Sequence, residues 1–558
     1  MKNLLISLSF AVISVSNLNA QTNYHSPLGI PLVLSSNFGE LRPNHFHMGV
    51  DFKTNLKTGY RLYAIEEGFV SRIKVSPYGY GKVVYIDHPN GMTSVYAHIS
   101  EFKGAVDSIV KLTQEKEQNF EVEIFPKKDE IKVERGEVFA LSGNSGSSTA
   151  PHLHFEIRET ITEHALNPLM FGFDIADNKE PELRGVKLYS ITKNGYRFPG
   201  KELTKLIVKG KYGYYIGGDA IEVPANYLTQ SGGLGLAFDV IDRLDGASNQ
   251  CGLYGSYLII DGDTLFSQAI DRIPFESTRY VNCHKDYEAY NSLRRKYHKS
   301  FKTTENDLPI YGSYGNGLIN AKPGQELNVE YIAFDVKGNQ SSIKFTLKIA
   351  AGEMSNEDVL FTTKNQLHPQ EEYTYSSESA QLEFPKKSVY EPIELNWAKL
   401  DYSILSPSTP VNVPFTIKCK VKGELDGKHY FEVATGGSNR ALEIKYEDNW
   451  AVAESKYYGP YSLKRDETGP TVYPVNFTNS TTFISKSTLV WKITDRGIGI
   501  KDYDLFIDEQ WHLLEYESKG DYITFSIPAN FSGTKNIRII ATDACGNETK
   551  WEKEVTIK

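Results

Sequence analysis

Short runs of alternating apolar and polar residues, separated by turns rich in glycine, asparagine and aspartate, recur along most of this 558-residue chain. Such alternation places successive side chains on opposite faces of a β-strand. The composition agrees, since there are 35 tyrosines and 28 phenylalanines against 5 methionines, and aromatic rings pack well on pleated sheets. We therefore predict a mainly β protein with room for three or four domains of about 150 residues each.

The first twenty residues have the pattern of a secretory signal peptide. Lys2 supplies positive charge, residues 4–15 are mostly apolar, and Ala20 is a small residue just before the expected cleavage point at Gln21. The apolar segment is too short to span a bilayer. We expect residues 1–20 to be removed, leaving no integral membrane segment, and the mature protein to be exported to the periplasm or the cell surface. The alternative is a buried N-terminal helix.

The chain carries a modest negative charge. Its 61 lysines and arginines are outnumbered by 70 aspartates and glutamates, which gives a formal net charge of −9. Binding to nucleic acid depends on basic side chains that neutralise phosphates. We therefore expect no nucleic-acid partner.

The cysteines are too few and too scattered for a disulfide scaffold or a zinc ribbon. They are Cys251, Cys283, Cys419 and Cys545. Cys251 and Cys283 fall in one candidate domain, where they either pair in an oxidising compartment or remain free thiols.

An internal repeat indicates the organisation of the C-terminal two thirds of the chain. Residues 332–339 and 540–547 share the pattern I-A-x-D-x-x-G-N, and each is followed by an alternating run. A turn of this kind before a final strand suggests immunoglobulin-like β-sandwich modules. We place one module at 176–350, interrupted near 267–314, and one at 467–558.

The stretch 351–466 is also β-rich, and we expect it to hold a third immunoglobulin-like module although it lacks the repeat. Each repeat turn pairs an aspartate with an asparagine, Asp335 with Asn339 and Asp543 with Asn547. Two oxygens are far fewer than the six to eight ligands that calcium takes. We therefore favour a plain hairpin turn over a calcium site.

Histidines are concentrated near the N-terminus, where eight of the 13 lie within the first 164 residues. Residues 152–157 alternate His, His and Glu with Leu, Phe and Ile, which is the pattern of a half-buried strand. Both imidazoles, His152 and His154, therefore project from one face of that strand. A second segment, 47–51, reads His-Met-Gly-Val-Asp and is expected to form a loop that leads into a strand.

These residue types suit zinc, which accepts imidazole nitrogen and carboxylate oxygen and, in catalytic sites, takes three protein ligands. His47, Asp51 and one of His152 and His154 supply three ligands, and the other histidine is left beside the metal. The chain contains no His-Glu-x-x-His sequence, which excludes the helical metalloprotease motif. A His-x-His pair alone is more often a surface or core pair than a metal site.

Taken together, the segments resemble the lysostaphin/LytM-type zinc endopeptidases, whose pattern is His-x-Gly-x-Asp, Tyr-x-His and a Gly-Asn-x-Gly turn that runs into His-Leu-His-Phe-Glu. The corresponding residues here are 47–51 (HMGVD), 96–98 (YAH), 143–146 (GNSG) and 152–156 (HLHFE). The resemblance covers about residues 29–173, under a third of the chain. It implies an antiparallel β-sheet peptidase domain, which we place at 21–175.

By this resemblance zinc is the cofactor, and His47, Asp51 and His154 are its ligands. His152 would be the catalytic histidine beside the metal-bound water, and His98 a second active-site histidine that helps to stabilise the tetrahedral oxyanion. Which of His98 and His152 acts as the base stays open at this point. Residues 106–132 form an insertion relative to the usual pattern, so a glycyl-glycine substrate is not assumed.

Three further residues have open roles. Glu156 shares the face of His152 and His154, and we favour a supporting or salt-bridge role for it. Arg42 either contacts a substrate carboxylate or lies in a solvated loop. Asn37 precedes Phe38-Gly39, and in some relatives an upstream asparagine occupies the metal.

The resemblance implies a secreted or periplasmic zinc metalloendopeptidase that hydrolyses peptide bonds in peptidoglycan cross-links, with the peptide stems as its substrate. The β-sandwiches would position the enzyme, hold the cell surface or bind envelope proteins. One alternative is a non-catalytic envelope scaffold or amidase activator on the same fold, although such proteins usually lose zinc ligands that are all present here. Another is an adhesin-like protein whose peptidase only processes an attachment site.

Overall fold

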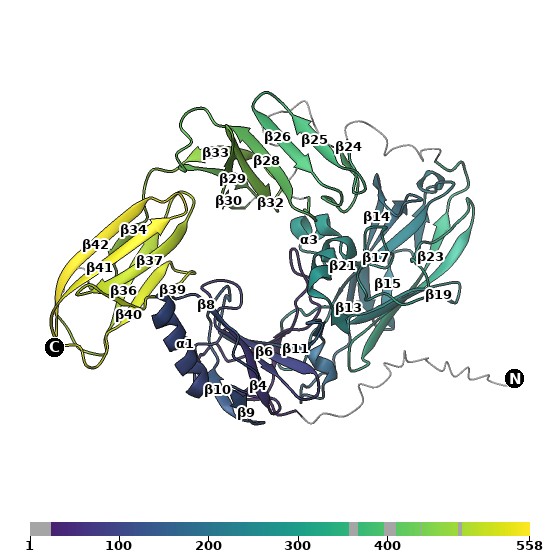
Figure 1. Ribbon diagram of the computed structural model, residues 1–558. Helices are drawn as coiled ribbons and strands as arrows, with labels where there is room; N and C mark the ends of the chain where they lie inside the picture. The colour runs from purple at the N-terminus through teal and green to yellow at the C-terminus, as the bar shows by residue number, and fades with distance from the viewer. Residues whose placement is uncertain (1–23, 356–365, 395–408, 436, 478–481) are drawn as a thin grey trace.

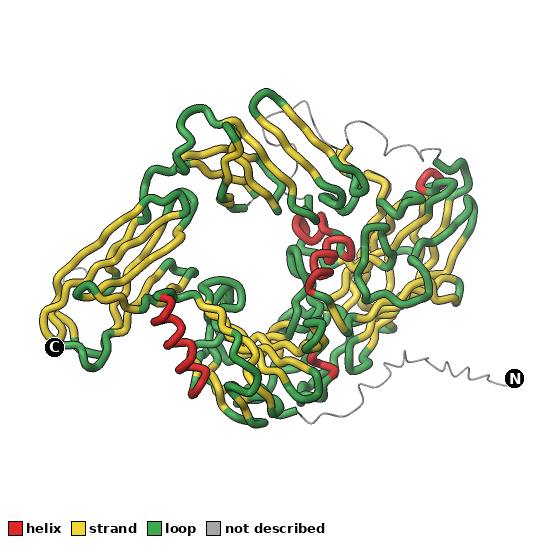
Figure 2. Tube along the Cα trace, in the orientation of Figure 1, coloured by secondary structure: helices red, strands yellow, loops and turns green. Residues whose placement is uncertain are grey.

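The computed structural model describes residues 24–355, 366–394, 409–435, 437–477 and 482–558, so the predicted signal peptide lies outside the described residues. Strands dominate and helices are few (Figures 1 and 2). This confirms a mainly β protein with an N-terminal sheet domain followed by further β-sheet domains. Among the helices that the structure describes, none is long and apolar enough to cross a membrane.

The N-terminal domain is built on one large sheet in which most strands run antiparallel. The path through its main strands is β1 (Leu34–Ser36), β2 (Val50–Lys53), β11 (His152–Glu159), β6 (Met92–Ala97), β5 (Val83–Asp87), β4 (Gly68–Val75) and β8 (Val122–Ile124). Two short strands extend it, β9 (Lys132–Val133) on β4 and β12 (Ala165–Leu166) on β11. A smaller sheet has the order β3 (Arg61–Tyr63), β10 (Val138–Leu141) and β7 (Glu101–Phe102).

Strand β11 lies near the centre of the large sheet, between β2 and β6. As the alternation predicts, Leu153, Phe155 and Ile157 point into the core and are fully buried. The opposite face is also covered, since Glu156 and Arg158 are buried there. The strand is therefore more buried than the predicted half-buried strand, because aromatic rings such as Phe275 lie over its polar face, 4.1 Å from the Arg158 guanidinium.

The predicted insertion at 106–132 contains regular structure. Helix α1 (Gly104–Glu117) buries Val106, Val110 and Gln114 on one face, which is the spacing of an amphipathic helix. Strand β8 then adds to the edge of the large sheet through β4.

The second module contains a long sheet with the order β19 (Asp263–Ala269), β18 (Gly255–Ile260), β22 (Glu326–Phe334), β23 (Gln340–Ile349), β15 (Gly213–Ile216), β14 (Arg197–Gly210), β13 (Glu182–Ile191), β17 (Gly233–Ile241) and β21 (Tyr297–Lys299). Strand β16 (Ala220–Val223) pairs with β23 in parallel. The segment between β19 and β21 carries β20 (Arg272–Ile273) and the short helices α2 (Val281–His284) and α3 (Tyr287–Leu293).

This segment joins the N-terminal domain directly. Strand β20 pairs with β12 and so extends the N-terminal sheet. Ile270, Ile273 and Val281 are fully buried in the same hydrophobic core as the strands of that sheet. The hydrophobic core is therefore continuous across the boundary predicted at 175/176. The positions of the domain boundaries remain predictions.

The last two modules each have separate sheets around their own cores. In the third module, one sheet has the order β25 (Tyr373–Ser376), β26 (Ala380–Phe384), β28 (Phe415–Lys420), β32 (Trp450–Ser455) and β31 (Lys445–Glu447). A second sheet has the order β30 (Asn439–Leu442), β29 (His429–Ala434) and β33 (Tyr461–Arg465). A third sheet is the pair β24 (Gln366–Leu367) and β27 (Ile393–Glu394). In the fourth module, one sheet has the order β34 (Thr471–Pro474), β36 (Thr488–Thr494), β40 (Tyr522–Ser526) and β39 (Glu515–Glu517). The other sheet has the order β35 (Thr482–Phe483), β42 (Glu548–Ile557), β41 (Gly533–Asp543), β37 (Ile500–Ile507) and β38 (Gln510–His512).

The modules follow one another around a ring, and the fourth returns to the first (Figure 1). Lys82 Nζ lies 3.0 Å from Glu515 Oε2, and the Ser518 hydroxyl donates to the Pro77 carbonyl at 2.6 Å. Lys519 donates to the Asn144 carbonyl. The C-terminal module therefore contacts two loops of the N-terminal domain.

The four cysteines are buried and unbonded, so Cys251 and Cys283 remain thiols. The repeat turns close as hairpins, with Asn339 donating from its backbone and side chain to Asp335, and Asn547 donating likewise to Asp543.

Candidate metal centre

Two of the three predicted ligands are placed by strand register. Asp51 on β2 and His154 on β11 are direct partners in the antiparallel ladder. Directly opposed residues have closely spaced Cβ atoms and share a face of the sheet. His47 lies outside the ladder, in the loop before β2, and reaches the same point.

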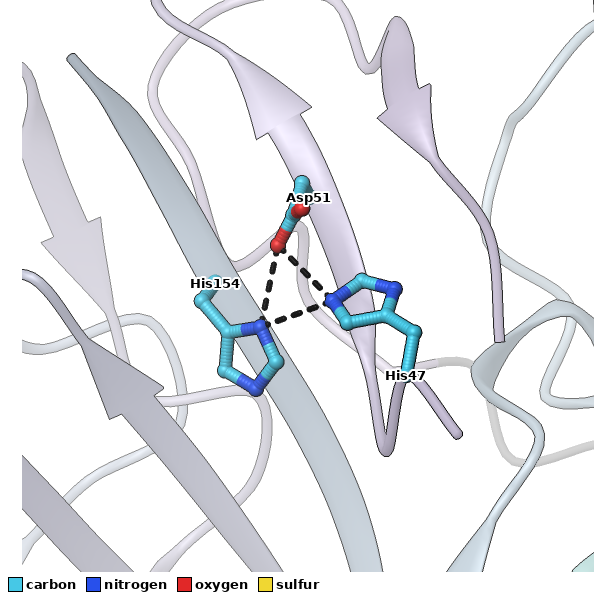
Figure 3. Close-up of side chains that lie close together, drawn as sticks. All are labelled: His47, Asp51 and His154. Carbon is cyan, nitrogen blue, oxygen red and sulfur yellow. Dashed lines mark hydrogen bonds and ion pairs between the residues drawn. The ribbon is translucent and has the colours of Figure 1, made fainter. Parts of the chain in front are cut away.

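The ligand atoms converge closely (Figure 3). The Nδ1 atom of His154 lies 2.9 Å from Asp51 Oδ1, and the Nε2 atom of His47 lies 3.1 Å from that same oxygen. The two imidazole nitrogens are 3.1 Å apart. Two nitrogens and one carboxylate oxygen thus face a common point.

The outer nitrogens of both histidines are held by acceptors. His47 Nδ1 lies 2.8 Å from the Asn37 carbonyl oxygen, to which it must donate. His154 Nε2 lies 2.8 Å from Glu156 Oε1. These contacts fix the tautomers and leave the lone pairs of His47 Nε2 and His154 Nδ1 on the side of Asp51. Metal-ligating histidines are commonly held in this way, so the donor set fits zinc.

Charged neighbours stabilise the acidic side chains. Burial opposes ionisation of Asp51, but His47, His152 and His154 outweigh it and hold the carboxyl pKa well below its ordinary value. Burial likewise opposes ionisation of Glu156, but Arg158 and His154 lower its pKa to about 2. Without a metal, burial disfavours a charged His154, whereas hydrogen bonds to Asp51 and Glu156 raise its pKa to about 9.

His152 and His98 lie beside this group, with ring centroids 4.7 Å apart. His152 Nδ1 donates to the Ala150 carbonyl at 2.8 Å, and its Nε2 lies 3.4 Å from Asp51 Oδ1. His98 Nδ1 donates to the Ser145 carbonyl at 2.9 Å. Both residues therefore present Nε2 as a lone pair, and both qualify as proton acceptors.

Gly49, within the segment 47–51, is needed for a steric reason. A Cβ atom at Gly49 would lie 2.4 Å from the Phe155 carbonyl oxygen and 3.0 Å from His154 Cε1. A contact as short as the one with the Phe155 carbonyl is essentially never seen in folded proteins, so glycine lets the chain before β2 approach β11 closely enough for His47 to reach His154.

The residues with open roles are placed as follows. Glu156 joins His154 to Arg158, whose Nε donates to it at 2.7 Å, and it also accepts from the Tyr80 hydroxyl. Arg42 donates to the Ser36 hydroxyl at 2.8 Å and lies 3.5 Å from Asp51 Oδ2. The Asn37 amide is turned away from the metal ligands.

Asn37 instead contacts the second module. Its Nδ2 donates to the Gly252 carbonyl at 2.9 Å, and its Oδ1 accepts from the Gly252 amide at 2.7 Å. In this conformation Asn37 does not occupy the metal position. Only its backbone carbonyl, through His47, takes part in the site.

Two further groups of three carboxylates lie together, and each includes the aspartate of one repeat turn. They are Asp177, Asp242 and Asp335, and Asp466, Asp495 and Asp543. Burial raises the pKa of Asp242 to about 8. The sequence pattern identified only Asp335 and Asp543, because their partners come from separate segments.

Comparison with known proteins finds a family match near the N-terminus and several similar proteins. Residues 45–115 match the sequence model of Peptidase family M23. An uncharacterized metalloprotease of Haemophilus influenzae is 34% identical over 131 residues, which is 24% of this chain and 21% of the relative. The DD-carboxypeptidase/endopeptidase Mpg of Neisseria meningitidis is 33% identical over 147 residues, 25% of this chain and 27% of the relative.

Among solved structures, the catalytic domain of the prophage-encoded M23 protein EnpA from Enterococcus faecalis is 26% identical, with a TM-score of 0.20, and the match covers 27% of this chain and 98% of that domain. The chain matches about a quarter or less of the length of the two curated relatives described above.

Proposed function

We propose that this protein is an exported zinc metalloendopeptidase that hydrolyses peptide bonds in peptidoglycan cross-links, because residues 45–115 match Peptidase family M23. The observation that carries the proposal is the convergence of His47 Nε2, Asp51 Oδ1 and His154 Nδ1 on one point. The substrate class follows from the resemblance to the lysostaphin-type enzymes.

His47, Asp51 and His154 would hold the ion. Zinc bound there would act as a Lewis acid on the scissile carbonyl and lower the pKa of water. With Nδ1 of each tied to a backbone carbonyl, His152 Nε2 and His98 Nε2 would accept a proton and return it to the leaving amine. Glu156 keeps His154 in the tautomer that presents Nδ1.

The chain outside this domain is proposed to position the enzyme. We infer that the units at 176–350, 351–466 and 467–558 are immunoglobulin-like sandwiches, and that they hold the cell surface or bind envelope proteins. The two sheets of the last unit enclose a common core around the fully buried Trp491, which supports this assignment there.

A non-catalytic scaffold is the main alternative. It predicts a degraded ligand set, whereas all three ligand atoms and both neighbouring histidines are present and oriented. A direct test is to measure zinc content and release of soluble peptides from purified sacculi for the chain beginning at Gln21.

We expect the wild type to bind about one zinc ion per chain and to cleave sacculi, and His154→Ala to lose both. His45→Ala is the matched control, because His45 is an exposed histidine two residues before His47. A wild-type protein with neither bound zinc nor cleavage would establish the scaffold alternative.

A further inference from the structure

The loop that delivers His47 is held by the second module. Lys285, at the end of α2, is fully buried, and its Nζ donates to the carbonyls of Arg42 at 2.5 Å and Pro43 at 2.7 Å. Its ammonium also lies 4.0 Å from the centroid of the Tyr290 ring. The two hydrogen bonds to the loop join residues that are more than 240 positions apart in the chain.

Other side chains of the same segment reinforce this attachment. The Thr278 hydroxyl accepts from the Phe46 amide at 2.9 Å, one residue before His47. The Tyr290 hydroxyl donates to the Leu41 carbonyl at 3.1 Å. The loop is therefore fixed through its backbone at both ends, so its attachment does not depend on most of its own side chains.

The segment just before this loop is docked in the same way. Glu40 Oε1 lies 3.2 Å from Lys296 Nζ, and Asn37 exchanges two hydrogen bonds with Gly252. Ile270 packs so closely on Gly39 that a Cβ atom there would lie 2.7 Å from Ile270 Cγ2. The Asn37 carbonyl, together with the Ser36 hydroxyl, orients the His47 imidazole.

Lys285 is a costly residue for a purely structural contact. Burial of an ammonium group is unfavourable unless it is paired, and here burial lowers its pKa to about 7. In the described part of the chain no carboxylate lies within ion-pair distance of it. Its donors are instead directed at two loop carbonyls, which no apolar side chain could hold.

We propose that Lys285 and Thr278 are positioning residues for the metal centre. Through them, the second module of the same chain holds the loop that brings His47 to the other two ligands. Asp51 and His154 are fixed by the β2/β11 register, whereas His47 depends on a loop that the second module holds in place. The inference rests on the proposed function in one respect only, namely that His47, Asp51 and His154 bind zinc.

The test uses the full mature chain with two substitutions that preserve side-chain size. Lys285→Met removes the donors, and Thr278→Val removes the acceptor for the Phe46 amide. Thr278→Ser retains that hydroxyl and serves as the conservative variant. Lys299→Met is the matched control, since Lys299 is an equally buried lysine of the same module that pairs with Glu391 and not with the loop.

Two quantities are measured, the zinc Kd by competition with a chromogenic chelator and the hydrogen exchange of peptides covering 36–47 in metal-free protein. We expect Lys285→Met and Thr278→Val to weaken zinc binding about tenfold or more and to accelerate exchange in 36–47. Thr278→Ser should stay within about twofold of the wild type. Lys299→Met should lower the melting temperature and leave the zinc Kd unchanged.

An unchanged zinc Kd and unchanged exchange in both Lys285→Met and Thr278→Val would overturn the inference. So would an equal loss of zinc affinity in Lys299→Met, because the effect would then reflect general destabilisation. If Lys285→Met fails to fold, Thr278→Val and Tyr290→Phe provide the same comparison. A wild type that binds no zinc would refute the proposed function, whereas the exchange of 36–47 would still decide whether the second module holds the loop.

Discussion

His154 stands directly opposite Asp51 in the ladder between β11 and β2, and its Nδ1 lies 2.9 Å from the Asp51 carboxylate. Strand register alone therefore brings together two of the three candidate zinc ligands. A shift of one residue would turn one of the two side chains to the opposite face of the sheet. The candidate metal centre thus depends on the accuracy of this one strand pairing.

Gly49→Ala tests the close approach of the chain to β11. The added Cβ would meet the Phe155 carbonyl and His154 Cε1, and relief of such overpacking costs about 1–3 kcal/mol and displaces backbone. We expect zinc affinity to fall about tenfold or more, as measured by chelator competition. Gly217→Ala is the control, because a Cβ there meets nothing within 4 Å. Wild-type zinc affinity in Gly49→Ala would show that the approach is not required.

His98→Ala and His152→Ala separate proton transfer from metal binding. Neither residue belongs to the group of three ligand atoms, so both variants should retain zinc. Loss of a positioned acid or base typically costs about 10²–10⁴-fold in rate, and we expect kcat on sacculi or a defined muropeptide to fall in that range. A variant that keeps its zinc and its kcat would have no part in proton transfer.

Glu156→Gln tests the buried contact between Glu156 and Arg158. The substitution leaves Arg158 without its buried carboxylate partner, and breaking such a pair costs about 3–5 kcal/mol. The folded-state pKa of Glu156 is lowered to about 2, so its stabilising charge is fully present above the unfolded-state pKa of about 4.3 and is lost as the pH falls toward 2. The penalty should therefore be constant from about pH 5 to 6.5 and shrink below pH 4. Above about pH 6.5 it should also fall, because Glu156 helps to raise the pKa of His154 and this contribution is lost as His154 deprotonates.

This prediction is checked by denaturant unfolding of metal-free protein across that pH range. Glu123→Gln is a suitable control, because Glu123 contacts Arg72 and Lys74 at the surface, where ion pairs contribute little. A penalty that grows as the pH falls below about 4 would contradict the assignment.

Ile273→Ala tests whether the second module contributes to the N-terminal core. Ile273 is fully buried in that core and lies on β20, which pairs with β12. Truncation of a buried isoleucine costs about 2–5 kcal/mol. We expect faster hydrogen exchange in peptides from β11 and β12, whereas Ile161→Ala, at a side chain that is 96% exposed, should leave exchange unchanged. Equal exchange in both variants would mean that the N-terminal domain is stable without this contact.

Much of the candidate site was accessible from the sequence because its determinants are local. The alternation in 152–157 predicted a strand with its histidines on one face, and that face does carry His154 and Glu156. The pattern of His47, Gly49 and Asp51 is likewise visible within five residues, although the steric reason for Gly49 is its contact with β11. The plain hairpin turn predicted at Asp335 and Asn339 also depends on residues that are close together in the sequence. By contrast, the sequence left open whether Cys251 and Cys283 pair, and it did not predict the amphipathic helix α1 (Gly104–Glu117).

The sequence by itself determined the side chains of the candidate metal site, the strand that carries two histidines and the mainly β character. Each of these is encoded by side-chain type and spacing over a few residues. Only the tertiary structure decided how the His47 loop is held, where the Asn37 amide points and that β20 joins the N-terminal sheet. The physical reason is that Lys285, Thr278 and Gly252 act on backbone carbonyls and amides far away in the chain. Every residue has such groups, so these contacts leave no pattern in the sequence.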